Sequence, residues 1–87
     1  MRAVEKASAP GPPRTLTQAH TELVRIRPGR DASSSAWLAY YQRSAALYEQ
    51  IAEIDPGHEL EALYWARREK ARAANIAAQI RAQAAHE

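Results

Sequence analysis

The chain has 87 residues, a formal net charge of +2 and no cysteine, so we expect one small domain without disulfides, thiolate zinc sites or a cysteine nucleophile. Apolar residues make up 46% of the chain, but half of these are alanine and none is phenylalanine, which favours helices around a small core. No apolar run approaches the roughly 20 residues that cross a bilayer, and the N-terminus lacks the apolar stretch of a secretory signal, so we expect a cytoplasmic protein without membrane contacts.

The N-terminal residues 1–14 carry three of the five prolines of the chain and are predicted to form a disordered tail. A single small helical domain is expected over residues 15–87. Its first helix is predicted over residues 16–26, with Thr15 or Thr17 as the N-cap and with Pro28 and Gly29 beyond its end. A helix of about ten residues is marginal alone in water, so it should lie on the rest of the domain.

A second helix is predicted over residues 34–54, where nothing interrupts the helical pattern. Ser33 or Ser34 is expected to be its N-cap, because serine side chains accept hydrogen bonds from the free N–H groups of a first turn. Aromatic and other side chains recur at steps of three and four residues and define one face of this helix. The residues of this face are Trp37, Tyr41, Ser44, Tyr48 and Ile51.

A third helix is predicted over residues 56–85, with Asp55 as its N-cap and Pro56 in its first turn. Because the connection between the second and third helices is short, the two should lie antiparallel. The predicted fold is therefore all-α: an antiparallel helical hairpin with a short N-terminal helix packed across it and a disordered N-terminal tail. The expected core of the hairpin consists of Tyr41, Tyr48, Leu60, Leu63 and Tyr64.

The two helices of the predicted hairpin differ in length. At 1.5 Å per residue, the third helix would be about 45 Å long and the second about 28 Å, so the third should extend beyond its partner. In an antiparallel pair, Trp37 would then lie opposite the region of Ile76 and Ile80.

The corner of the hairpin reads "YEQIAEIDP" from Tyr48 to Pro56, followed by "EALYWA" from Glu61. This stretch of about twenty residues resembles the junction between tetratricopeptide repeats, with Tyr48, Asp55 and Pro56 at matching positions. A repeat of that family places two helices within 34 residues and needs about three copies for stability. Here residues 36–54 form one uninterrupted predicted helix and no second copy follows, so a capped helical corner is the expected structure. The chain as a whole also resembles small helical proteins of actinobacteria, a resemblance that implies no particular activity.

A basic segment follows the corner. Arg67, Arg68, Lys70 and Arg72 lie within six residues, and Arg81 follows on the same predicted helix. Cations on a helix contact phosphate groups in many nucleic-acid-binding proteins, so an accessory or regulatory protein of that kind is one functional hypothesis. The low net charge and the neighbouring acidic residues favour the other interpretation, a solvated helix face.

Catalytic and cofactor signals are weak in this sequence. His20, His58 and His86 are dispersed and lack a second metal ligand at helical spacing, so no metal site is predicted. With three glycines in the whole chain there is no glycine-rich phosphate loop. We therefore expect no cofactor and no enzymatic activity.

The favoured hypothesis is a small protein-interaction module that self-associates, for example as a homodimer, or docks on another protein. Alanine-rich helix faces permit close helix contacts, and a core so poor in large side chains leaves apolar surface to cover. Trp65 fits either an interface or the edge of the hairpin core, since tryptophan is enriched at protein interfaces. The predicted interface residues are Trp65, Ala74, Ile76, Ala77 and Ile80.

Overall fold

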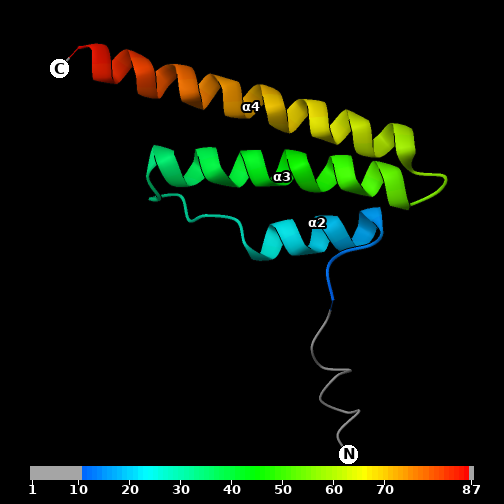
Figure 1. The fold of residues 1–87 in the computed structure, drawn as a ribbon. Helices are drawn as coiled ribbons and strands as arrows, with labels where there is room; N and C mark the ends of the chain where they lie inside the picture. The colour runs from blue at the N-terminus through cyan, green and yellow to red at the C-terminus, as the bar shows by residue number, and fades with distance from the viewer. Residues whose placement is uncertain (1–10, 87) are drawn as a thin grey trace, which may run out of the picture.

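The computed structural model describes residues 11–86, and these residues form three helices and no strand. The helices are α2, Leu16–Arg25; α3, Ser34–Ile54; and α4, Glu59–Ala85. Figure 1 shows α3 and α4 running antiparallel as a hairpin, with α2 packed along α3. The all-α hairpin with a short N-terminal helix is therefore confirmed. Most of the predicted disordered tail, residues 1–10, lies outside the described residues.

Two side chains from different parts of the chain cap α2. The Thr15 hydroxyl accepts a hydrogen bond from the Gln18 N–H at 3.1 Å, as its sequence position predicts. The Asp55 carboxylate, which belongs to the hairpin corner, accepts one from the Leu16 N–H at 2.8 Å. The apolar side of α2 is buried through Leu16, Ala19 and Leu23. The short helix is thus held by apolar burial along its length and by a polar contact at its start.

The predicted face of α3 is the face that the structure buries. Ser33 caps the helix, with its hydroxyl accepting from the Ala36 N–H at 3.1 Å. Ser44, Tyr48 and Ile51 are buried, together with Ala45. The Ser44 hydroxyl donates to the Tyr40 carbonyl at 2.8 Å, which satisfies a polar group inside the core.

The predicted start of the third helix at Pro56 is wrong, because α4 begins at Glu59. Asp55 ends α3, and its N–H donates to the Ile51 carbonyl at 2.9 Å. Gly57 then adopts a φ of +89°, a left-handed conformation that favours glycine and that no helix continues through. His58 therefore takes the N-cap position of α4, without a side-chain cap, and the Asp55 side chain binds α2 instead.

The buried side of α4 also differs from the prediction. Ala62, Ala66, Glu69 and Ala73 face the interior. Two of the expected core residues point to solvent instead: Leu60 is 81% exposed and Tyr64 is 54% exposed. Alanines on α4 allow it to approach α3 closely, and this contact orients the helix with its larger apolar side chains outward.

Of the remaining expected core residues, Tyr48 is buried, whereas Tyr41 and Leu63 are half-buried. The apolar cluster at the centre of the molecule instead joins all three helices: Leu16, Ala19 and Leu23 of α2, Tyr48 and Ile51 of α3, and Ala62 and Ala66 of α4.

Aromatic contacts fix the register of the hairpin. The ring centroids of Tyr48 and Trp65 are 6.1 Å apart, and the Arg72 guanidinium lies 5.7 Å from the Tyr41 ring centroid. Stepping seven residues back along α3 therefore corresponds to stepping seven residues forward along α4. One further turn places Trp37 level with Ile76, in agreement with the predicted register. The last turns of α4 extend beyond α3 (Figure 1). Among the described residues, no helix is both long enough and apolar enough to cross a membrane.

Candidate interaction sites

The side of α4 turned away from α3 carries a line of exposed residues, which we call the outer face of α4. Its members recur at alternating steps of four and three residues, the spacing of a helix face that contacts another helix. The outer face of α4 consists of Leu60, Tyr64, Arg67, Ala71, Ala74 and Ala78. It combines two large apolar side chains at its start with small residues further along.

The five predicted interface residues do not share one surface. Ala74 lies on the outer face of α4 and is exposed. Ile76, Ala77 and Ile80 are half-buried, in the part of α4 that reaches the beginning of α3 and passes it. Trp65 is also half-buried and packs against the central apolar cluster.

The structure assigns Trp65 to the edge of the core, the second of its two predicted roles. The centroid of its ring lies 5.3 Å from the His20 ring and 6.1 Å from the Tyr48 ring. Trp65 thus connects α4 to both α2 and α3. The His20 Nδ1 atom lies 2.8 Å from the Tyr48 hydroxyl, so this histidine is part of the same cluster.

Two arginines of the basic segment lie near a third that is distant from them along the chain. Arg68 and Arg72 of α4 lie with Arg27, which follows α2, around a small hollow. Each guanidinium lies over an aromatic ring: Arg27 is 5.6 Å from the Trp37 ring centroid and Arg68 is 5.1 Å from that of Trp65. Arg72 covers the Tyr41 ring in the same way, and its Nη1 donates a hydrogen bond to the Tyr41 hydroxyl at 3.5 Å.

This arginine hollow has a volume of about 190 Å³. Its lining consists of Arg27, Trp37, Tyr40, Tyr41, Arg68, Glu69 and Arg72. Glu69 is 9% exposed and is the one carboxylate among these residues. No ion pair joins it to the arginines within residues 11–86. Sequence reasoning missed both Arg27 and Glu69, because Arg27 is distant along the chain and a lone glutamate on a helix normally faces solvent.

The other cations of the basic segment point elsewhere. Arg67 lies on the outer face of α4, and Lys70 forms an ion pair with Glu49 of α3. Arg81 is exposed near the end of α4. The five predicted nucleic-acid-binding residues therefore spread around the helix rather than forming one basic surface.

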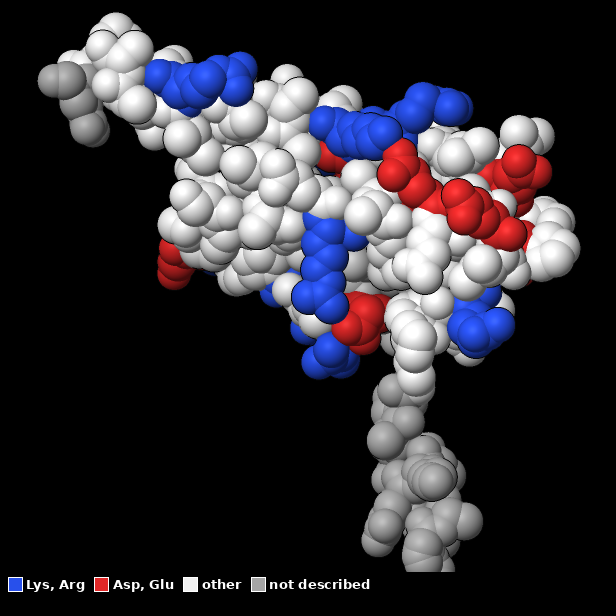
Figure 2. All heavy atoms as spheres, in the orientation of Figure 1, with Lys and Arg blue, Asp and Glu red and all other residues white. Residues whose placement is uncertain are grey.

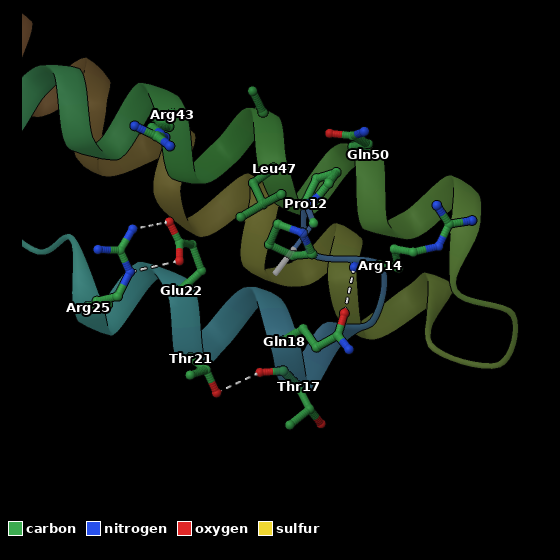
Figure 3. A pocket seen from close by; sticks show the side chains of 13 residues that line it. Pro12, Arg14, Thr17, Gln18, Thr21, Glu22, Arg25, Arg43, Leu47 and Gln50 are labelled. Carbon is green, nitrogen blue, oxygen red and sulfur yellow. Dashed lines mark hydrogen bonds and ion pairs between the residues drawn. The ribbon is translucent and has the colours of Figure 1, made fainter. Parts of the chain in front are cut away.

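A wider groove, with a volume of about 1210 Å³, has α3 on one side and α2 on the other, together with the segment that precedes α2. Its floor includes Ala46 and Leu47. The polar side chains along α2 are engaged locally, as Figure 3 shows: Arg25 binds Glu22 through two contacts, at 3.0 and 2.8 Å, and the Gln18 side chain accepts from the Arg14 N–H. The hydrogen bond from Arg25 lowers the pKa of Glu22. Several polar groups beside this groove are therefore already paired within α2 and the segment before it.

The three histidines predicted to be dispersed do not form a metal-binding cluster among the described residues. Within residues 11–86, no group of three histidine or acidic side chains is placed to hold a metal ion. His20 is in the core cluster, and His58 lies 3.2 Å from the Asp55 carboxylate at the corner. His86 ends α4.

Comparisons with known proteins give no family assignment. The chain matches no protein-family model, no curated protein and no solved structure. Its function is therefore argued from the surfaces described above.

Proposed function

We propose that this chain is a small protein-interaction module that self-associates by pairing the outer face of α4 with the same face of a second copy. The observation that carries the proposal is the exposure of Leu60 and Tyr64, at 81% and 54%, one turn apart on a helix whose other side is buried. Burying apolar surface of this kind is the main favourable term in protein association.

The small residues further along the outer face supply the complementary surface. Ala71, Ala74 and Ala78 are exposed and let a second helix approach closely. In an antiparallel pair of α4 helices, Leu60 and Tyr64 of one copy would cover the alanine-rich half of the other. Because an isologous interface repeats each contact, the Leu60 and Tyr64 side chains of both copies would be buried.

The charges along α4 favour the antiparallel arrangement over the parallel one. Glu59 and Glu61 open the helix, whereas Arg81 lies near its end. Figure 2 shows acidic side chains gathered toward the end of the molecule that holds the α3–α4 connection, with cationic side chains further along α4. An antiparallel pair brings opposite charges together at both ends, whereas a parallel pair would align like charges.

Solution mass measured by light scattering over a concentration series tests the proposal. We expect a dimer at micromolar concentration that persists in high salt, because its contacts are largely apolar. Leu60→Glu and Tyr64→Glu should each produce a monomer with unchanged helix content. Val24→Glu is the matched control, since Val24 is also an exposed apolar residue, at 73%, but lies on α2. A wild-type chain that stays monomeric and cooperatively folded would refute self-association.

Nucleic-acid binding is the alternative, and the dispersal of its five cations weakens it. The paired substitution of Arg68 and Arg72 by glutamate separates the two functions. It should abolish binding to nucleic acid if that is the function, while leaving the oligomeric state nearly unchanged.

A further inference from the structure

The arginine hollow holds three guanidinium groups whose charges have no ion-pair partner within residues 11–86. We propose that this hollow binds a dianionic phosphate group, as carried by a phosphorylated serine or threonine side chain of a partner protein. This site is separate from the outer face of α4, and the inference does not depend on self-association.

The aromatic rings prepare the arginines for this role. A guanidinium that lies over a ring has one planar face covered, while the N–H donors along its edge remain available. Arg27, Arg68 and Arg72 lie 5.6, 5.1 and 5.7 Å from the ring centroids that they cover. The forked edge of a guanidinium matches two oxygens of a phosphate, which is why arginine clusters recognise phosphorylated side chains.

Charge indicates which anion fits. The three arginines and the buried Glu69 leave the lining of the hollow with a net charge of +2. A phosphate monoester carries about −1.5 to −2 charges at pH 7, so it balances this lining. A carboxylate, or one phosphodiester of a nucleic acid, carries a single negative charge and would leave the balance incomplete.

The size of the hollow selects a single group rather than a whole small molecule. Its volume of about 190 Å³ is below the 300–1,000 Å³ typical of pockets that enclose small ligands. Arg27 and Arg68 are also exposed, so the hollow opens to the surface. A phosphate at the end of a side chain can enter such a hollow while the rest of the partner stays outside.

Nuclear magnetic resonance titration of the full chain tests the inference, with resonances of Trp37 and the arginine side chains as reporters. The probes are four: a Gly-Ser-rich peptide with one phosphoserine, the same peptide with serine or with aspartate at that position, and a single-stranded oligothymidylate. We expect the phosphoserine peptide to perturb Trp37, Arg68 and Arg72, and inorganic phosphate to displace it. The serine peptide should not bind, and the aspartate peptide should bind at least about tenfold more weakly, because it offers one charge less.

Substitutions within the hollow identify the residues responsible. Arg68→Gln and Arg72→Gln should each weaken phosphopeptide binding by about tenfold, the usual effect of losing a hydrogen bond to a charged group. Arg81→Gln removes the same charge from an exposed site on α4 outside the hollow and should leave binding nearly unchanged. Glu69→Gln should strengthen binding, since it removes the one negative charge in the lining.

Several outcomes would overturn the inference. One is equal binding of the phosphoserine, serine and aspartate peptides, or no binding of any. Another is a loss in Arg81→Gln as large as that in Arg72→Gln, which would indicate general attraction between charges. Tighter binding of the oligothymidylate through the same arginines would assign the hollow to nucleic acid instead. Circular dichroism of each variant verifies that the helices remain formed.

Discussion

Asp55 ends α3, yet its side chain binds the beginning of α2. Its carboxylate accepts from the Leu16 N–H at 2.8 Å, and the same oxygen lies 3.2 Å from His58 Nδ1. A negative charge at a helix N-terminus also interacts favourably with the helix dipole. The corner of the hairpin and the short N-terminal helix are therefore joined through one residue.

Removal of this carboxylate should loosen α2 selectively. We expect Asp55→Ala to lower the free energy of unfolding by about 1–2 kcal/mol, the usual loss for an N-terminal helix cap. Urea denaturation measures the total, and hydrogen exchange should show the loss of protection concentrated in α2. Asp31→Ala is the control, because Asp31 is exposed in the linker between α2 and α3. Equal losses in the two variants would contradict a capping role.

Tyr48 makes the stability of the fold sensitive to alkaline pH. Burial, with a further contribution from the negative charge of Glu69, raises the pKa of Tyr48 from 10.0 to about 12. Since the folded-state pKa lies above that of the unfolded chain, the fold favours the neutral phenol. This stabilisation is complete below pH 10 and is lost as the pH rises toward 12.

The expected result is a stability that falls more steeply with alkaline pH in the wild type than in Tyr48→Phe, which has no phenol to ionise. Urea denaturation at a series of pH values between 9 and about 12 measures both slopes. Burial also raises the pKa of Tyr40, which is present in both proteins, so the difference between the two slopes reports on Tyr48. Parallel slopes would show that Tyr48 ionises as freely in the folded protein as in the unfolded chain.

Among the helices, α3 could be predicted from the sequence in both extent and orientation. Its bounds match the prediction, and its face through Ser44, Tyr48 and Ile51 is buried. Large aromatic side chains on one side and charged side chains on the other give this helix a clear contrast.

For α4, the sequence predicts a helix but not its orientation. Alanines occur on all of its sides, so the faces of α4 differ little in hydrophobicity. The large residues Leu60 and Tyr64 then predict a buried face that the structure exposes. Close packing of Ala62 and Ala66 decides the orientation instead. The arginine hollow was unpredictable for a related reason: it depends on the distance in space between Arg27 and α4, which only the packing of α2 sets.

Close contact through small residues predicts that α4 tolerates enlargement only on its exposed sides. Ala66 is 2% exposed and belongs to the central cluster, so Ala66→Leu should cost about 1–3 kcal/mol through overpacking. Ala82→Leu makes the same change at an exposed position near the end of the helix and should have little effect. Thermal denaturation compares the two variants, and similar melting temperatures would argue against a tightly packed alanine contact.

At the scale of the whole molecule, α3 and α4 pair as a hairpin, and α2 packs on α3 and reaches Trp65 of α4. In Figure 1, α4 lies along one edge of the molecule, and the residues of its outer face are exposed. The exposed Leu60 and Tyr64 on this edge are the residues that the proposed second copy would cover.

The proposed antiparallel dimer brings the start of one α4 beside the end of the other, which a parallel dimer would not do. In that arrangement, Glu61 near the start of α4 approaches Arg81 of the second copy twice, once at each end of the interface. Glu61→Arg or Arg81→Glu alone should weaken dimerisation by roughly 0.5 kcal/mol or more for each lost pair, as expected for exposed ion pairs. The double variant exchanges the charges and should recover most of the affinity, and these differences should shrink in high salt.

Sedimentation equilibrium measures the dimerisation affinity of the wild type, the two single variants and the double variant. A double variant no better than the weaker single one would exclude the antiparallel pairing, whereas recovery would place Leu60 and Tyr64 against the alanines of the second α4.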